Sequence, residues 1–132
     1  MSHSELIAEY ARNPPNNYRM DNYIVSHNEE SRVCGDTIEV FLKIKENIIE
    51  DYSFIGNTSI ITTASASIFG ESIIGMDIKD ILDFSLDYIQ DLIGEVSPRR
   101  RHAATLGLLA TRNAIHGYLN DGITDDFSDV LE

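Results

Sequence analysis

The segment RVCGDT, residues 32–37, places a thiol and a carboxylate two positions apart. Cys34 is the only cysteine of the chain, and Asp36 follows it after Gly35. A glycine lets the backbone turn tightly, so thiolate and carboxylate could face one point, as metal ligands must. The alternative is that Gly35 and Asp36 simply make a turn before a strand. A single cysteine cannot form an internal disulfide, which agrees with a reducing compartment.

The segment SPRRRHAATL, residues 97–106, gathers three arginines and a histidine at the predicted start of a helix. The helix dipole disfavours cations there, yet Arg99, Arg100 and Arg101 are three of the chain's ten basic residues. They could pair with some of the 22 acidic residues, or they could bind an anion or an acidic partner. His102 is a candidate metal ligand, although a lone histidine more often has a structural role.

A third segment, GNTSIITTASASIF, residues 56–69, is rich in small hydroxyl and methyl side chains. A hydrolase nucleophile elbow needs Gly-x-Ser-x-Gly, and the closing glycine is absent. A Walker loop needs Gly-Lys-Ser/Thr, which is also absent. The remaining interpretation is a helix start, where hydroxyls can cap and alanines allow close packing.

The hydrophobic pattern predicts an α+β fold in which helices pack on a small antiparallel sheet. Alternation is clearest in TIEVFLKIK, Thr37–Lys45, and a turn at Glu46-Asn47 predicts a hairpin with the next strand. The predicted strands are Tyr23–Ser26, Thr37–Lys45 and Ile48–Ile55; the predicted helices are Ser4–Arg12, Ser59 to about Gly75, Asp77–Ile93, and Ser97-Pro98 to about Leu119. The acidic end of the chain, from about residue 121, is predicted to be a loosely held, flexible tail.

The composition of the chain argues against some classes of function. The chain of 132 residues is expected to form one domain, and its formal net charge of −12 argues against nucleic-acid binding. No apolar run approaches the length of a membrane span, and the polar N-terminus does not resemble a signal peptide, so we expect a cytosolic protein without membrane partners.

Four segments in this order carry a resemblance to a known family: NPPNN, CGDTIEVFLKIKENIIEDYSFIG, ASASIFGESIIGM and RRRHAATL. The chain resembles the iron–sulfur cluster assembly scaffolds of the IscU, SufU and NifU N-terminal type, from about Leu6 to Leu119. The resemblance implies an α+β fold with a three-stranded antiparallel sheet. It also implies a protein that is not itself an enzyme, that holds a nascent iron–sulfur cluster, iron or zinc, and that receives sulfur from a cysteine desulfurase.

The family's ligand positions transfer unevenly to this chain. The first ligand cysteine falls on Cys34 and the aspartate of its motif on Asp36, while the histidine that precedes the third cysteine matches His102. The second and third cysteines fall on Ser59 and Ala103, so two of three thiolates are missing. The basic residue three positions before the third cysteine matches Arg100, which, with Cys34, is a candidate for sulfur transfer or partner binding.

Three hypotheses remain open. In the first, the protein is a divergent scaffold in which Cys34, Asp36 and His102 bind iron or zinc and Cys34 accepts persulfide sulfur. A variant of it places Cys34 and His102 of two subunits of a homodimer around one cluster. In the second, the metal site is lost and the fold is an interaction or regulatory module of cluster assembly. The third is a small-molecule binder on the same fold.

Overall fold

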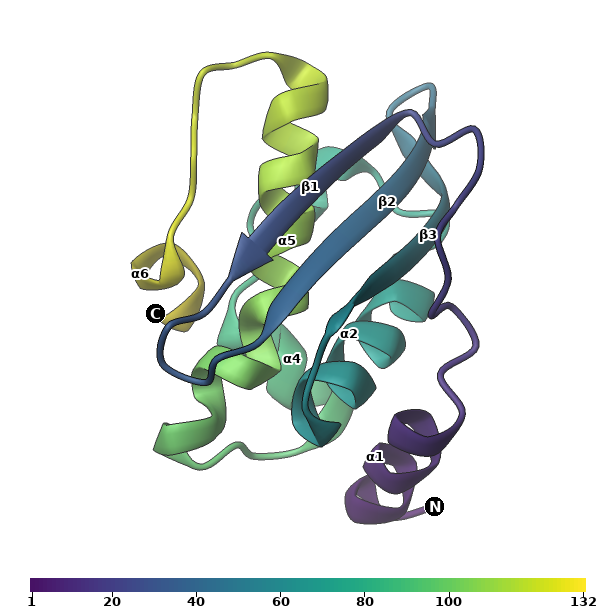
Figure 1. Ribbon diagram of the computed structural model, residues 1–132. Coiled ribbons are helices and arrows are strands. Elements are labelled where there is room, and N and C mark those ends of the chain that lie inside the picture. Colours follow the sequence, from purple (N-terminus) through teal and green to yellow (C-terminus); the bar gives the residue numbers. More distant parts are fainter.

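The computed structural model describes residues 1–132 and contains three strands and several helices (Figure 1). The strands pair antiparallel in the order β1-β2-β3, and α2 and α5 lie together behind one face of the sheet. The elements are α1 His3–Arg12, β1 Val25–Glu30, β2 Thr37–Lys45, β3 Ile48–Asn57, α2 Ile60–Ser72, α3 Ile78–Ile81, α4 Leu86–Ile93, a 3-10 turn η1 Pro98–Arg100, α5 Arg101–Leu119 and α6 Phe127–Leu131. The predicted α+β class is confirmed.

The β2–β3 hairpin follows directly from the alternating sequence. Val40 and Leu42 point into the core between the sheet and the helices, where both are fully buried. The turn residues Glu46 and Asn47 have φ values of 54° and 64°, which is the left-handed pair that a two-residue hairpin needs. The strand Thr37–Lys45 was predicted with its observed bounds, and the hairpin partner extends two residues beyond the predicted Ile55.

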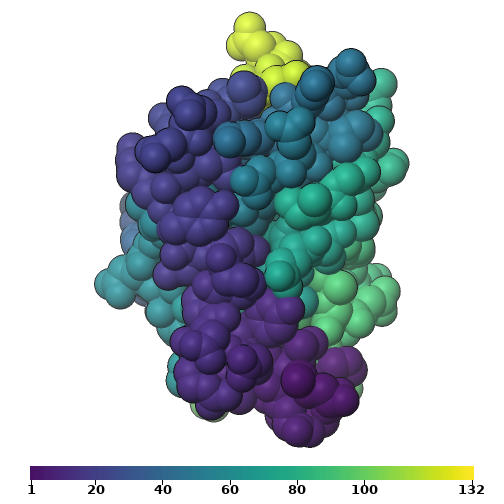
Figure 2. All heavy atoms as spheres, turned by 90° about the vertical axis from the view of Figure 1, so that its right-hand side faces the viewer, coloured from purple at the N-terminus to yellow at the C-terminus, as the bar shows by residue number.

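The other face of the sheet is covered by the segment between α1 and β1. Phe41 is fully buried there beneath Tyr23, with the two ring centroids 5.2 Å apart, and the Arg19 guanidinium carbon lies 5.3 Å from the Phe41 ring centroid. Figure 2 shows this N-terminal segment in purple and dark blue, running along the molecule beside the strands. The first strand begins at Val25 and ends at Glu30, later than the predicted Tyr23–Ser26, because Tyr23 serves as part of this cover.

The predicted helix Asp77–Ile93 is wrong, because the structure divides it into α3 and α4. The apolar stripe continues across the break, so hydrophobic periodicity alone did not reveal it. Phe84 stacks on Tyr88 at the break, with centroids 3.8 Å apart, and its carbonyl accepts a 2.8 Å hydrogen bond from Arg112 Nη1. The irregular backbone therefore has a partner in α5 that only the tertiary structure supplies.

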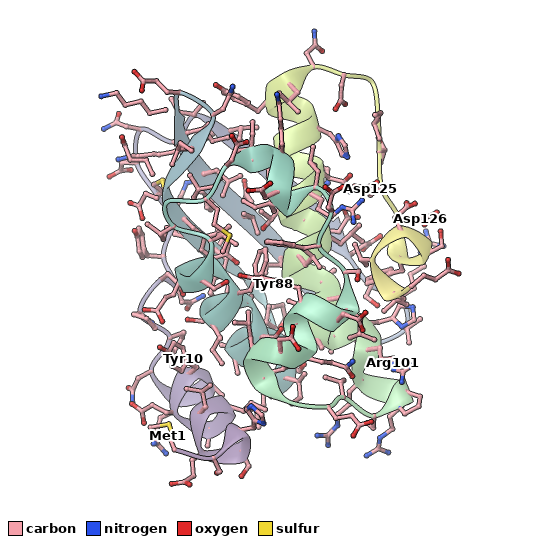
Figure 3. The ribbon with its side chains drawn as sticks, turned by 180° about the vertical axis from the view of Figure 1, so that it is seen from behind. Met1, Tyr10, Tyr88, Arg101, Asp125 and Asp126 are labelled. Atoms are coloured by element: carbon pink, nitrogen blue, oxygen red, sulfur yellow. The ribbon has the colours of Figure 1, made fainter.

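The end of the chain is packed against α5, which contradicts the expected loosely held tail. Val130 of α6 is fully buried, and Asp125 is 8% exposed. Asp125 Oδ2 lies 2.8 Å from Arg112 Nε and 2.9 Å from His116 Nε2. Figure 3 shows Asp125 and Asp126 beside α5, at the start of the short terminal helix.

Two further acidic residues, Asp121 and Glu29, extend this C-terminal network. The hydrogen bond between His116 Nδ1 and Asp121, 2.7 Å long, lowers the pKa of the Asp121 carboxyl. Burial raises the pKa of Glu29, but hydrogen bonds with His27 and Asn113 together lower it further than burial raises it. The network thus joins β1, α5 and the chain end through charges whose ionised forms it stabilises.

No helix of the protein combines the length and the apolar character that crossing a membrane would require.

The Asp125 interaction leads to a stability prediction. Asp125→Ala leaves the largely buried Arg112 without a carboxylate and removes one of the two carboxylate partners of His116, so we expect the free energy of unfolding to fall by about 3 kcal/mol. Urea denaturation followed by circular dichroism measures it. Asp91→Ala, an exposed position on α4, is the control and should change stability by less than about 0.5 kcal/mol. Equal effects of the two substitutions would show that the Asp125 interactions contribute little to the stability of the fold.

Candidate functional site

A pocket of about 640 Å³ lies beside Cys34 at the end of the molecule where α2 and α5 begin. Three separate segments form its wall: the loop between β1 and β2, the start of α2 and the start of α5. The lining residues are Cys34, Ser59, Ile60, Ile61, Arg99, Arg100 and Ala103. The structure therefore brings together the three positions that match the family's cysteines, along with Arg100.

The loop that carries Cys34 is held by its own backbone. Gly35 N donates to Ser31 O at 2.8 Å, and Ser31 N donates to Asp36 O at 3.0 Å. Gly35 has a φ of 77°, a conformation that favours glycine. The tight turn predicted from Gly35-Asp36 is therefore present, and it leaves the Cys34 side chain partly exposed at the pocket wall.

Asp36 ties this loop to the start of α2. Its Oδ2 accepts hydrogen bonds from Ser59 N at 3.1 Å, from Ser59 Oγ at 2.8 Å and from Thr62 Oγ1. Ser59 caps α2 only by its backbone position, and the first turn of α2 has no acidic residue. The buried Asp36 carboxylate supplies the negative charge that a helix N-terminus favours.

His102 lies away from the pocket lining. Its ring lies against Phe127 of α6, with centroids 4.4 Å apart, so the end of the chain covers it. No group of three or more His, Cys, Asp or Glu side chains is arranged to hold a metal ion. Cys34, Asp36 and His102 thus do not form a ligand set in this arrangement, because Asp36 is hydrogen-bonded to α2 and His102 is packed on Phe127.

The arginines at the start of α5 have no carboxylate partners. The ion pairs of the structure involve Arg12, Arg19 and Arg112, besides two histidines, and none involves Arg99, Arg100 or Arg101. Arg99 and Arg100 are exposed and line the pocket. Arg101, labelled in Figure 3, does not line it, and its Nε is buried without a hydrogen-bond partner. The alternative that these arginines pair with acidic residues is therefore not what the structure shows.

Sequence reasoning missed part of this site. The hydroxyls of residues 56–69 were expected to cap their own helix, whereas the Thr62 hydroxyl donates to Asp36 across the fold. Ile60 and Ile61 contribute the apolar wall, and Ile60 is 68% exposed. An isoleucine pair directly after a capping serine was the available signal, but only the packing of α2 shows which way the pair faces.

Comparison with known proteins agrees with this architecture. Residues 2–124 match the NifU-like N terminal domain, and the chain belongs to that family. The resemblance to iron–sulfur cluster assembly scaffolds is thereby confirmed. Among structures, a NifU-like protein (N-terminal) from Brucella abortus has a TM-score of 0.76 at 19% identity, covering 90% of this chain and 94% of that one. It supports the fold.

Two curated relatives carry functional names. The iron-sulfur cluster assembly scaffold protein IscU of Thermotoga maritima is 35% identical over 86 residues, which are 65% of this chain and 59% of that protein. The zinc-dependent sulfurtransferase SufU of Bacillus subtilis is 34% identical over 82 residues, or 61% of this chain and 54% of that protein. The matched regions therefore span somewhat more than half of these relatives.

The shared pocket leads to a prediction about metal binding. The variant Ser59→Cys/Ala103→Cys adds two thiols to the pocket that Cys34 lines, which makes three in all. We therefore expect it to bind close to one zinc ion per chain. Zinc is measured by elemental analysis after reconstitution without oxygen and removal of unbound metal.

The control is Ala8→Cys/Thr124→Cys, which adds two thiols at exposed positions on separate segments. It should bind no more zinc than the natural chain. If both double variants retain the same amount of zinc, positions 34, 59 and 103 do not converge as the structure indicates.

Proposed function

We propose that this protein is a scaffold-like component of iron–sulfur cluster assembly that accepts sulfur on Cys34. The observation that carries the proposal is the position of this one thiol in a pocket lined by two unpaired arginines. A thiolate near cations is favoured and nucleophilic. The names of the IscU and SufU relatives add support from the family.

Sulfur acceptance needs no redox partner. The Cys34 thiolate attacks the outer sulfur of a cysteine persulfide on a donor protein, and a bond forms between Cys34 Sγ and that sulfur. The sulfur–sulfur bond of the donor breaks, and the donor cysteine leaves as a thiolate. A cysteine desulfurase, or another iron–sulfur assembly protein that carries a persulfide, is the partner we propose. In this proposal the protein is a carrier of the sulfur on its own side chain and is not an enzyme in its own right.

Iron or zinc would be cargo rather than a resident cofactor. Cys34, Asp36 and His102 supply acceptable donor atoms, but Asp36 would have to leave Ser59 and Thr62, and His102 would have to leave Phe127. The arrangement in hand fits sulfur acceptance without such changes. It therefore also favours a second candidate, an interaction module of cluster assembly that holds no metal.

The sulfur step is tested by transfer to the purified protein. Incubated with a cysteine desulfurase and cysteine, the natural chain should gain one sulfur atom by intact-mass spectrometry, and Cys34→Ser should gain none. Arg12→Gln, an exposed change on α1, serves as a charge control and should gain sulfur normally. A natural chain that stays unmodified while the desulfurase is active would refute sulfur acceptance at Cys34.

The metal question is decided by a separate measurement. Metal and acid-labile sulfide are assayed in protein purified without oxygen, beside Cys34→Ser. We expect less than one iron or zinc per chain, because the three donors are not assembled. Metal near one per chain that is lost in Cys34→Ser would instead establish the three-ligand site, and sulfide together with iron would establish a cluster shared between subunits.

A further inference from the structure

Sulfur bound to Cys34 has no route of release within the chain. Release of persulfide sulfur requires attack by another thiolate or reduction, and the chain contains no second cysteine. Ser59 and Ala103, the positions that match the family's other two cysteines, line the same pocket but carry no thiol. Release without a reductant therefore requires an outside thiol that comes to Cys34.

The pocket has the size and surface of a small-molecule site. Its volume of about 640 Å³ falls within the usual range of about 300–1,000 Å³ for such sites. Ile60, Ile61 and Ala103 offer apolar surface for a carbon skeleton. No acidic side chain lines the pocket, although the chain carries 22 acidic residues; the nearby Asp36 carboxylate is held by Ser59 and Thr62.

The charge of the pocket selects an anion. Arg99 and Arg100 line it, and neither makes an ion pair. A guanidinium presents parallel N–H donors that match a carboxylate. Both arginines also lie in the turn that leads into α5, where the helix dipole adds positive potential. In a chain of net charge −12, two cations without partners beside the only thiol make this a local site for carboxylates.

We propose that the acceptor of Cys34 sulfur is a small thiol that carries carboxylate groups, bound with its carboxylates at Arg99 and Arg100. The proposal rests on the proposed function, since Cys34 must first hold a persulfide. The bound thiolate attacks the outer sulfur of that persulfide, a new sulfur–sulfur bond forms, and the bond to Cys34 Sγ breaks. Cys34 returns to a thiolate, and the small thiol leaves as a persulfide, with no net oxidation or reduction.

A small acceptor explains the arrangement better than a protein thiol. The arginines and the thiol line one pocket, so a single molecule of modest size reaches both with its own carboxylate and sulfur. The combination of a thiol, two cations and an apolar wall therefore specifies a short carboxylate-bearing thiol.

The test follows sulfur loss from a chemically loaded protein, so it does not depend on any desulfurase. Cys34 is converted to a mixed disulfide with 2-mercaptoethanol, and sodium sulfide then yields the Cys34 persulfide. Loss of the extra sulfur is timed by mass spectrometry with mercaptosuccinate, which bears two carboxylates, and with neutral 2-mercaptoethanol. The ratio of the two rates is compared between protein variants, so that the intrinsic reactivity of each thiol cancels.

In Arg99→Gln/Arg100→Gln we expect this ratio to fall by about three- to tenfold, as expected for losing two partly exposed charge pairs. The matched control, Lys45→Gln/Lys79→Gln, removes the same charge at exposed positions and should keep the ratio of the natural chain. Lys45 ends β2 at the β2–β3 turn, and Lys79 follows Asp77, which bridges to Ile48 beside that turn; Figure 1 shows the turn at the other end of the molecule from the start of α5.

Two results would overturn the proposal. An unchanged ratio in the arginine variant would show that no carboxylate is recognised, and a protein thiol would then be the better acceptor. An equal fall in both variants would show only the effect of net charge. Failure of the desulfurase to load Cys34, together with normal discharge of the chemically loaded persulfide, would refute the proposed donor step and leave the acceptor site standing.

Discussion

The contact of Asp36 with the start of α2 sets the geometry on which the candidate site depends. One carboxylate oxygen accepts from the backbone and side chain of Ser59 and from Thr62, and it is buried. A buried carboxylate costs free energy unless it is well hydrogen-bonded. The Asp36 carboxylate finds its hydrogen-bond donors only when the loop meets the start of α2 in this way. Because Cys34 lies two residues before Asp36, the same contact determines where the thiol faces. The pocket between the loop, α2 and α5 is a consequence of it.

The small residues of α2 serve the packing of that helix rather than chemistry. Ser65 Oγ donates to Ala104 O at 2.5 Å, and Ser67 Oγ donates to Asn16 Oδ1 at 2.6 Å. A Cβ added at Gly107 of α5 would lie 2.9 Å from the Ala66 Cβ, closer than side chains pack. The two helices therefore approach each other closely only while these positions stay small, and the hydroxyls satisfy buried polar groups on α5 and on the NPPNN turn. This packing is independent of the side chains at positions 59 and 103, so the fold does not require cysteines there.

Much of the fold could be predicted where the physical cause is local. The alternation of Thr37–Lys45 predicted its strand, and the three positions that the resemblance matched to cysteines, Cys34, Ser59 and Ala103, line one pocket. Prediction failed where a distant partner decides the structure. The break after α3 depends on Arg112 reaching the Phe84 carbonyl, and the ordering of the chain end depends on buried charges in α5. Neither signal lies within the segment that it shapes, and the same holds for the contact of His102 with Phe127.

The electrostatics of the chain point to the role of the retained thiol. Other cations of this protein form ion pairs with acidic side chains, as Arg112 does with Asp125. The arginines around Cys34 are left without such partners, even though negative charge is abundant elsewhere. Exposed ion pairs contribute little to stability, so the fold loses little by leaving Arg99 and Arg100 free. A thiolate and a carboxylate ligand are both anions, and both are stabilised by the same positive potential. With Ser59 and Ala103 in place of further thiols, the pocket presents one thiol and two cations, which is the arrangement on which the proposed sulfur acceptance rests.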